Sequence, residues 1–352
     1  MSEENKYRFT KNIPVPDIGT DTISLAHGSG GKLTNRLLDH GVFDLFKNDT
    51  LQKRDDGAVL KMDGEMAFST DSFVVSPIFF PGGDIGELAI NGTVNDVAMT
   101  GGIPKYLSLS FIIEEGLLLK DFWEILHSIK HTSHKAGVQI VTGDTKVVEK
   151  GKGDQIFVNT TGVGPMHPKA NLGVEKIETD DVILISGNVA SHGMAILSKR
   201  EGLEFESDIL SDTANLNVLT NSLLDEFGDG IKLFRDPTRG GIATVLNEIA
   251  VQLKKGIKIS EKYPILPQVK SACEIFGLDP LYVANEGIML IVIKKELAEN
   301  ALEILRKLPN GEHAALLGSI SEEHPGKVIS KSGLGGNRVV AMPIAEQLPR
   351  IC

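Results

Sequence analysis

Apolar residues along the first half of the chain recur at spacings that predict alternating strands and helices. The expected helices are 84–100 and 119–135, and the expected strands are 107–113, 138–142 and 155–163. The helix at 119–135 has the clearest period, because its apolar residues share one face and Gly137 follows as a stop signal. Asp63-Gly64 separates the apolar runs 58–62 and 65–70, which predicts a hairpin.

A second series of elements begins after Gly164-Pro165. Strands are expected at 181–186 and 288–293, and helices at 193–200, 243–254 and 296–308. Neither half has a regular βαβ alternation, so the pattern favours an α+β fold over one doubly wound sheet. A chain of 352 residues is also too long for one ordinary core. The expected parts are an extension (1–22), two mixed α/β domains (23–166 and 167–332) and a flexible C-terminal tail (333–352).

The composition of the chain excludes several classes of protein. The formal net charge of −11 opposes binding to nucleic acid or to an anionic membrane. The only cysteines are Cys273 and Cys352, which excludes a disulfide scaffold and a cysteine-rich metal site. No apolar run is long enough to cross a bilayer, and the polar N-terminus lacks the core of a signal peptide. We therefore expect a cytoplasmic protein.

The tail has the composition of a mobile arm that carries a thiol. Gly333-Leu334-Gly335-Gly336 is a hinge sequence, and the sixteen residues from Asn337 to Cys352 could span roughly 50 Å when extended. A terminal cysteine can also be incidental, because chain ends are often disordered. Prenylation does not fit, since its motif places the cysteine four residues from the end. The thiol gains a role only if the rest of the chain supplies chemistry for it.

A glycine-rich string is the first candidate for that chemistry. It consists of Gly28, Ser29, Gly30, Gly31 and Lys32, preceded by His27. Small residues let backbone N–H groups approach a phosphate, and a lysine adds a positive charge. The string is not a Walker A loop, because Ala26 stands where its first glycine belongs and Leu33 replaces Ser or Thr. Taken alone, a loop of this kind is more often a flexible linker.

Aspartates at turns and strand ends form the second candidate. They are Asp56, Asp71, Asp96 and Asp144. Magnesium binds through a few carboxylates together with substrate phosphates, so this set is compatible with a metal–nucleotide site. Each of them could instead be a turn or cap residue. Asn91 and Asn95 share a helix face beside Asp96, where their low helix propensity suggests a functional role.

The sequence Arg235-Asp236-Pro237-Thr238-Arg239-Gly240-Gly241 precedes one expected helix. Its two arginines could hold a phosphate group, and Thr238 or Asp236 could cap the helix. Lys146 lies close to Asp144, and Glu286 precedes an apolar strand. Lysine and glutamate are usually surface residues, but a thiol-bearing arm would give both a catalytic role.

Together these strings closely resemble the HypE family of carbamoyl dehydratases, within the PurM/AIR-synthetase-like superfamily. The resemblance runs from His27 to Cys352. It rests on His27–Gly31, Ser69–Ser72, Phe79–Gly83, Asn95–Ala98, Val141–Val148, Arg235–Gly241, Ala284–Gly287 and Pro349–Cys352. The terminal Pro-Arg-Ile-Cys is the most specific, because related superfamily members with the same nucleotide site lack it. Only the N-terminal extension falls outside the pattern.

The resemblance implies a reaction on the tail itself. In the family, the carbamoyltransferase HypF places a carbamoyl group on the terminal cysteine, and ATP drives its dehydration to a thiocyanate. The cyano group then passes to the iron of a [NiFe]-hydrogenase precursor on the HypC–HypD scaffold complex. The family also forms homodimers through the N-terminal sheets, with nucleotide bound near that interface.

The same resemblance implies a role for each candidate. Cys352 would accept the carbamoyl group, Glu286 would remove its N–H protons, and Lys146 would steady negative charge on oxygen. The four aspartates would hold Mg²⁺ on the phosphates of ATP. The remaining cofactor-binding residues would be Gly28, Ser29, Gly30, Gly31, Lys32, Asn95 and Asp236.

Two other functions are compatible with the sequence. One is an ATP-dependent enzyme of the same superfamily that acts on a small, formylglycinamidine-type substrate, for which Cys352 would be dispensable. The other is a nucleotide-binding adaptor whose tail only docks a partner. The adaptor would tolerate Cys352→Ser, whereas the dehydratase would lose all activity with its acceptor sulfur.

Overall fold

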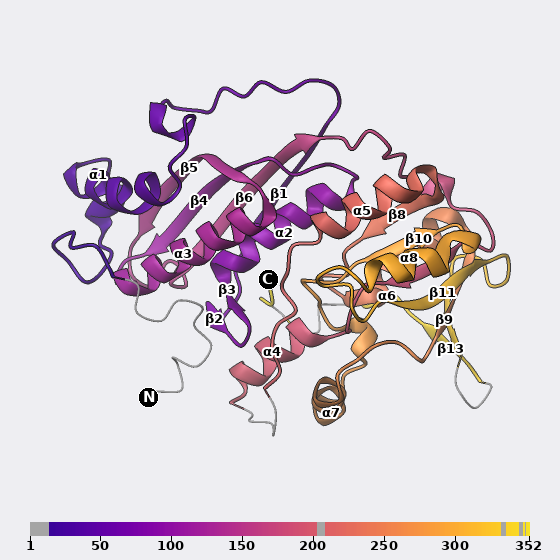
Figure 1. Cartoon of the computed structure of the whole chain (residues 1–352). Helices are drawn as coiled ribbons and strands as arrows, with labels where there is room; N and C mark the ends of the chain where they lie inside the picture. The colour runs from indigo at the N-terminus through magenta and orange to yellow at the C-terminus, as the bar shows by residue number, and fades with distance from the viewer. Residues whose placement is uncertain (1–13, 203–207, 332–335, 345–347, 349) are drawn as a thin grey trace.

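The computed structural model describes residues 14–202, 208–331, 336–344, 348 and 350–352. In this part of the chain the main strands form a four-stranded and a seven-stranded sheet, each with its own helices (Figure 1). We call these the N-terminal unit and the C-terminal unit. The two units confirm the expected α+β fold. The first part of the expected extension and most of the expected glycine hinge lie outside the described residues.

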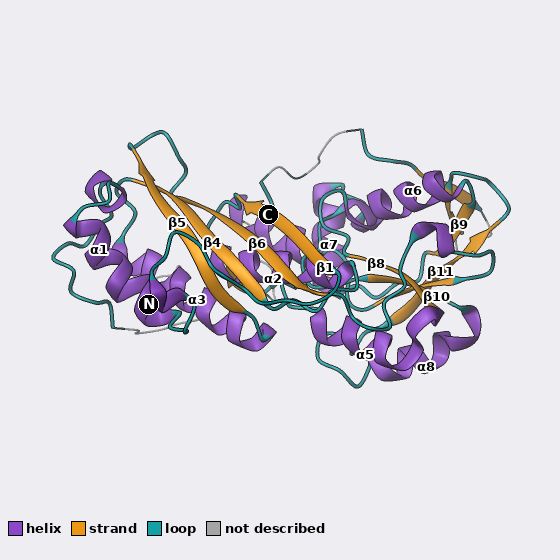
Figure 2. Cartoon of the chain, turned by 90° about the horizontal axis from the view of Figure 1, so that it is seen from above, coloured by secondary structure: helices purple, strands orange, loops and turns teal. Residues whose placement is uncertain are grey.

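The N-terminal unit is a mixed sheet covered by helices on one face (Figure 2). Its strand order is β1-β6-β4-β5, in which only β4 and β5 are parallel. The bounds are β1 Met66–Phe73, β4 Tyr106–Glu114, β5 Gln139–Val148 and β6 Ile156–Pro165. The helices are α1 Lys32–Leu38, α2 Ile85–Met99 and α3 Leu119–Ala136, and the short strands β2 Phe79–Phe80 and β3 Gly83–Asp84 precede α2.

Local sequence explains where α2 begins and how it packs. The Asp84 carboxylate accepts hydrogen bonds from the backbone N–H groups of Gly86 (2.7 Å) and Glu87 (3.0 Å), as a helix N-cap does. Gly86 permits close contact with α3, because a Cβ there would lie 2.7 Å from the carbonyl oxygen of Ile125. The two helices therefore pack tightly on each other.

The other face of this sheet is open within the described chain. Phe68 on β1 is 70% exposed and Ile112 on β4 is 47% exposed. Register places both on the same face, because Phe68 is aligned with Val163, which is aligned with Tyr106, and Ile112 lies six residues after Tyr106. An apolar side chain on an uncovered sheet face is available for contact with another molecule.

The C-terminal unit is a larger mixed sheet with the order β13-β12-β9-β11-β7-β10-β8. Its strands are β7 Val182–Ile185, β8 Ile231–Arg235, β9 Gly256–Ser260, β10 Leu290–Ile293, β11 Ala315–Ser321, β12 Val328–Lys331 and β13 Asn337–Val340. Its helices are α4 Ser191–Arg200, α5 Asn217–Phe227, α6 Gly241–Leu253, α7 Pro267–Phe276 and α8 Ala298–Leu305. Strands β7 and β10 are buried along their whole length, which matches their continuous apolar runs.

The predicted hairpin at 58–70 is wrong. Residues 58–62 form no strand, and Val59 is 84% exposed, whereas β1 pairs instead with the distant strand β6. Gly64 does form a bend, but the first apolar run is only half-buried and pairs with no strand. Residues Asn337–Val340, which we expected in the tail, form the edge strand β13 beside β12.

The end of the tail lies between the two units (Figure 1). The backbone N–H of Val74 donates to the carbonyl oxygen of Cys352 (3.1 Å), and that of Ser76 donates to Arg350 (3.4 Å). The Arg350 side chain donates to the carbonyl oxygen of Val74 and pairs with Asp154 at 2.5 Å. The described end of the tail is thus docked along the segment that follows β1.

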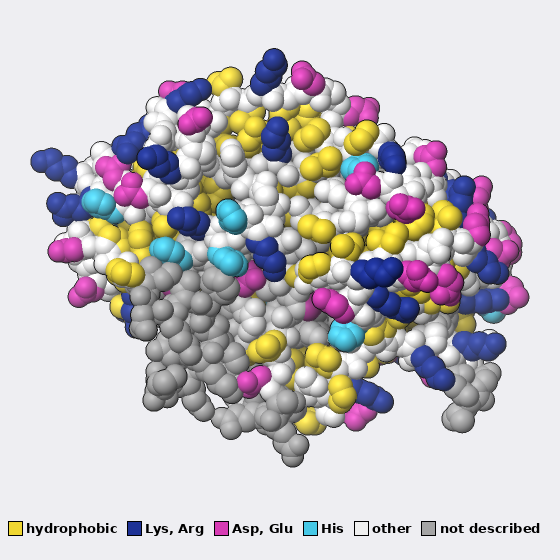
Figure 3. All heavy atoms as spheres, viewed as in Figure 1, with side chains coloured by type: hydrophobic (Ala, Val, Ile, Leu, Met, Phe, Trp, Pro, Cys, Tyr) yellow, Lys and Arg dark blue, Asp and Glu magenta, His cyan; other side chains and the backbone are white. Residues whose placement is uncertain are grey.

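Charges of both signs are mixed over the face shown in Figure 3. The net charge of −11 is therefore not gathered into one acidic patch on this face. Among the described residues, no helix combines the length and the apolar character needed to cross a membrane.

Candidate active site

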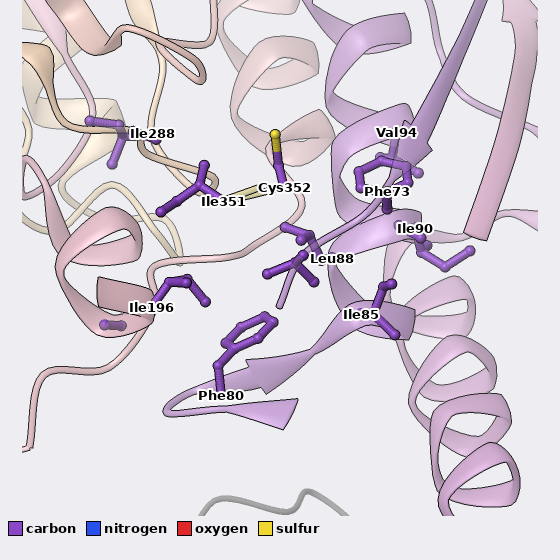
Figure 4. Close-up of a cluster of buried hydrophobic side chains, with 14 of the residues drawn as sticks. Phe73, Phe80, Ile85, Leu88, Ile90, Val94, Ile196, Ile288, Ile351 and Cys352 are labelled. Atoms are coloured by element: carbon purple, nitrogen blue, oxygen red, sulfur yellow. The ribbon is translucent and has the colours of Figure 1, made fainter. Parts of the chain in front are cut away.

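The docked thiol of Cys352 lies in a closed environment. Figure 4 shows its sulfur above the apolar cluster of Phe73, Leu88 and Ile351, and the residue is 7% exposed. Arg239 Nε donates a hydrogen bond to Sγ at 3.3 Å. Burial, reinforced by the carboxyl of Glu286, raises the pKa of the thiol to about 12, against the lowering effect of Arg239. The docked sulfur is therefore a thiol at neutral pH and a poor nucleophile.

Glu286 is the acid whose charge has the largest effect on the pKa of this thiol. The residue is 4% exposed, and its Oε1 has no hydrogen-bond partner within the described part of the chain. Burial raises the pKa of its carboxyl well above the ordinary value, and the carboxyls of Asp236, Asp212, Asp71 and Asp96 raise it further. A carboxyl in this setting binds a proton readily, as a general base requires.

Asp212 supports Glu286 from a loop that sequence reasoning did not single out. Its Oδ2 accepts hydrogen bonds from the backbone N–H groups of Glu286 (3.3 Å) and Gly287 (3.0 Å). Gly287 is needed for this approach, since a Cβ would lie 1.6 Å from the carbonyl oxygen of Asp212. Nothing in the local pattern signals this role, because the two segments are far apart in sequence.

Asp96 and Asp236 line a cleft of about 690 Å³ beside the thiol, together with Ser69, Arg235 and Arg239. Ser69 Oγ donates to Asp96 Oδ2 at 2.8 Å. Burial, and then the neighbouring carboxyl of Asp236, raises the pKa of Asp96 to about 7. Burial also raises the pKa of Asp236 and of Asp71. The cleft is thus a confined acidic space with arginines at its edge.

Asn95 joins the two units. Its Nδ2 donates to the carbonyl oxygen of Ala214 (3.0 Å), and its Oδ1 accepts from the backbone N–H of Leu216 (2.8 Å). These contacts give a structural reason for a buried asparagine in α2. The expectation that Asn95 binds a cofactor stays a prediction.

A second pocket, of about 350 Å³, collects the glycine-rich string and the other candidate residues. It is lined by Gly28, Gly30, Asp56, Asp144, Lys146 and apolar side chains such as Phe43. Gly28 has to be a glycine, because a Cβ there would lie 2.6 Å from the backbone nitrogen of Val147. Ser29, Gly31 and Lys32 do not line this pocket, although they lie in the same turn.

Lys146 and Asp144 form a close pair at the mouth of this second pocket. Lys146 Nζ lies 2.6 Å from both carboxylate oxygens of Asp144, and this hydrogen bond lowers the pKa of Asp144. The two side chains are more than half exposed, so the pair is worth little for stability. It is available to exchange partners with a bound anion and cation.

The two pockets are separate within one chain. Asp71 lies on β1 and Asp144 on β5, at opposite edges of the four-stranded sheet, roughly 14 Å apart at about 4.8 Å per strand. Asp144 and Lys146 are aligned with Ser110 and Ile112 and so lie on the open face. Within the described residues, no group of three or more His, Cys, Asp or Glu side chains is arranged to hold a metal ion. The predicted metal-binding aspartates therefore fall into two pairs, and the metal assignment stays a prediction.

Comparison with known proteins places the chain in a family. The models "AIR synthase related protein, N-terminal domain" and "AIR synthase related protein, C-terminal domain" match residues 54–166 and 178–331. Carbamoyl dehydratase HypE of Rhizobium leguminosarum bv. viciae is 45% identical over 338 residues, which are 96% of this chain and 97% of that protein. The chain belongs to the HypE family of carbamoyl dehydratases. HypE of Escherichia coli (strain K12) is 43% identical over 94% of this chain and its own full length.

Solved HypE structures agree with this assignment. The crystal structure of hydrogenase maturation protein HypE in complex with ATP has a TM-score of 0.90 and 46% identity, covering 93% of this chain and 99% of its own. HypE in a HypE–HypF complex has a TM-score of 0.77 and 44% identity, covering 87% and 99%. Thiamine monophosphate kinase from Aquifex aeolicus, at 18% identity and a TM-score of 0.57, covers 84% of this chain and 95% of its own and shares only the fold. The family resemblance found in the sequence is thereby confirmed.

Proposed function

We propose that this protein uses ATP to dehydrate a carbamoyl group carried on its own Cys352, giving a thiocyanate that supplies the cyanide ligand of a [NiFe]-hydrogenase iron centre. The observation that carries this proposal is the docked sulfur of Cys352, held by Arg239 and electrostatically coupled to the buried carboxyl of Glu286. An acceptor thiol and a carboxyl able to take a proton are thus in one enclosed place, and both are required to dehydrate a thiocarboxamide.

The overall reaction converts S–C(=O)–NH₂ and ATP into S–C≡N, ADP and phosphate. The carbonyl oxygen receives the γ-phosphoryl group as one N–H proton leaves, and C≡N forms when the second proton and the phosphate depart. Glu286, in its ionised form, would accept the first N–H proton, release it to the departing phosphate or to water, and then accept the second; the raised pKa of its carboxyl makes it a stronger base. Arg239 would hold the sulfur, so that the carbamoyl group extends toward the acidic cleft.

The second pocket has the features of the ATP site. Backbone around Gly28 to Gly31, with Lys32, would cradle the phosphates, and the close fit of Gly28 against Val147 leaves room for no side chain there. When bound, ATP supplies the phosphoryl group that turns a poor leaving oxygen into a good one. Lys146 would leave Asp144 to steady negative charge on the transferred group. Asp236 would contact the nucleotide from the cleft, and Asn95, which is buried beside Asp96 and does not line the cleft, would have to exchange its contacts with Ala214 and Leu216 to bind it.

Mg²⁺ would be held by the aspartates Asp56, Asp71, Asp96 and Asp144. Burial and mutual repulsion keep the pKa of Asp96 near 7, and a divalent cation would relieve that repulsion. Asp56 and Asp144 line the second pocket, whereas Asp96 lines the cleft and Asp71 lies on β1, at the sheet edge opposite to Asp144. The homodimer implied by the family, formed through the N-terminal sheets, would have to bring the second pocket of one copy to the β1 edge of the other to complete the set, because Asp71 lies three residues from Phe68 and so points to the helix side of its own sheet.

The burial of the thiol bears on how the proposed partners would reach it. At 7% exposure and with a pKa near 12, docked Cys352 is closed to an external enzyme. The tail must therefore undock to receive its carbamoyl group from HypF, and again to deliver the cyano group to the HypC–HypD scaffold. The existence of a HypE–HypF complex for a relative that is 44% identical supports the first encounter.

Mass spectrometry of the C-terminal peptide tests this function. After incubation with the carbamoyltransferase and its donor, we expect Cys352 to gain a carbamoyl group, and to lose one water only when Mg-ATP is added. Glu286→Gln should still be carbamoylated but should lose water at least about 100-fold more slowly. The exposed Glu274→Gln on α7 is the matched control and should behave like the unaltered protein.

The outcome that overturns the proposal is an unmodified Cys352 peptide while the same carbamoyltransferase modifies a control acceptor. In that case the ATP-dependent enzyme acting on a small molecule becomes the better assignment. Carbamoylation without ATP-dependent loss of water would contradict the dehydratase step alone.

A further inference from the structure

The last two residues of the tail are held by polar groups from both units. From the N-terminal unit, Val74 N–H donates to the carbonyl oxygen of Cys352. From the C-terminal unit, Arg239 donates to the sulfur, and His192 Nε2 lies 2.8 Å from the carbonyl oxygen of Ile351. The third contact involves a histidine that the proposed chemistry does not use.

His192 lies fully buried in the first turn of α4, and its hydrogen bonds determine which ring nitrogen carries the proton. A carbonyl oxygen can only accept, so Nε2 bears the hydrogen that it donates to Ile351. In the neutral ring Nδ1 then accepts from the hydroxyl of Ser211, at 2.8 Å. Ser211 Oγ in turn accepts from the backbone N–H of Thr213 at 3.1 Å, which fixes the hydroxyl.

The same contacts exclude His192 as the base of the reaction. Both of its nitrogens are engaged, so neither is free to take a proton from the carbamoyl group. Burial, with a contribution from Arg200, lowers the pKa of His192 to about 4, which keeps the ring neutral. The Phe80 ring packs against the His192 ring in a T-shaped arrangement, with centroids 5.6 Å apart, and restricts its rotation. Its role is thus to hold, in one orientation, a single donor aimed at the tail.

We propose that His192 is a positioning residue that sets the register of the docked tail. By holding the carbonyl oxygen of Ile351, it fixes the backbone one residue before the thiol, while Val74 fixes the carbonyl of Cys352 itself. With both points held, Sγ lies at Arg239, within reach of the charge of the Glu286 carboxyl. Without the Ile351 contact, the buried carbonyl loses its donor and the docked state weakens relative to the undocked one.

The first test measures docking by the rate at which Cys352 is alkylated. Only the undocked thiol reacts readily, so the rate reports how often the tail leaves the site. His192→Phe keeps a ring of similar size without a donor and should raise the rate about tenfold. His192→Gln can place an amide N–H near the Nε2 position and should stay within about threefold of the unaltered protein. Buried Cys273 on α7, read from its own peptide, reports any general loosening of the fold.

Two results would overturn the proposal. If His192→Phe is alkylated at the unaltered rate, the Ile351 contact does not control docking. If Cys352 is alkylated as fast in His192→Gln as in His192→Phe, docking depends on the shape of the imidazole ring and not on its N–H donor. Should His192→Phe also expose Cys273, Ser211→Ala takes its place, since it releases the orientation of the ring without emptying the core. For Ser211→Ala we expect a rate between those of the glutamine and phenylalanine variants.

A second readout links docking to the proposed function, on which this part of the inference rests. His192→Phe should slow ATP-dependent loss of water from carbamoylated Cys352 about as much as it speeds alkylation, while carbamoylation by the partner is not slowed. Alkylation requires neither ATP nor the partner. If the unaltered protein fails to dehydrate its tail, the proposed function fails, but the docking result still stands.

Discussion

At the scale of single residues, the candidate site depends on acids whose protonation the protein controls by burial. Glu286, Asp96 and Asp212 all have raised pKa values, and in each case burial is the largest cause. The sequence identified Glu286 and Asp96 because each lies in a recognisable string. It could not identify Asp212, because a hydrogen bond to the backbone of Glu286 leaves no trace in the local pattern around either residue.

Asp212 provides a pH-dependent prediction of stability. Burial raises its pKa to about 6, against an ordinary value of 3.8, so folding takes up a proton between these pH values. Its contribution is therefore favourable below pH 4 and is lost as the pH rises to about 6. Asp212→Asn, which keeps an oxygen to accept from Glu286 and Gly287, should gain melting temperature relative to the unaltered protein as the pH is raised from 4 to 7. The exposed Asp63→Asn is the control, and an unchanging difference for Asp212→Asn would contradict the prediction.

At the scale of elements, helices with a clear period and good end signals were predictable. The predicted helix 119–135 is α3, for which amphipathic spacing and the Gly137 stop are local signals. The predicted helix 84–100 is α2, which is buried on nearly all sides and whose local signals are its Asp84 cap and the glycines that follow it. The hairpin failed because pairing is decided between strands, and β6 is a better partner for β1 than the run just before it. The edge strand β13 was missed because its four residues include asparagine and arginine and follow a glycine-rich segment.

Contact between α2 and α3 gives a prediction at this scale. Gly86→Ala improves intrinsic helix propensity, but its Cβ would meet the carbonyl oxygen of Ile125 at 2.7 Å and Ile129 Cγ1 at 2.9 Å. We expect the clash to dominate and to destabilise the protein by about 1–3 kcal/mol. Denaturant unfolding would measure this change. Gly57→Ala, where a Cβ meets nothing within 4 Å, should be nearly neutral; equal stability of the two variants would show that the helices can move apart.

At the scale of the whole molecule, the distribution of site residues points beyond one chain. Sequence reasoning placed the aspartates in one metal site, but it could not foresee that the order β1-β6-β4-β5 puts Asp71 and Asp144 on opposite edges. Strand order depends on contacts between distant segments, which the spacing of residues within a segment does not encode. The exposed apolar side chains of Phe68 and Ile112 make the open face the proposed site of contact with a second copy.

A charge placed on that face should dissociate the proposed dimer without unfolding the chain. Phe68→Glu would bury a charge in the proposed dimer interface, so we expect the dimer to dissociate at least about 100-fold more readily and ATP turnover to fall with it. Sedimentation velocity and ATP hydrolysis on the same samples measure both. Val251→Glu replaces another exposed apolar residue, on α6, and should change neither. A monomeric Phe68→Glu protein with full turnover would show that one chain holds the complete nucleotide site.

The docked tail has a consequence for how the two units communicate. Val74 and Asp154 on one side and His192, Arg200 and Arg239 on the other all bind the same few residues. Anything that changes the angle between the units must then change the affinity for the tail, and thermodynamic reciprocity requires the converse. The carbamoyl or cyano group proposed for the sulfur would add atoms to a nearly closed space. Under the proposed function, the orientation of the two units would therefore differ between the empty and the loaded thiol.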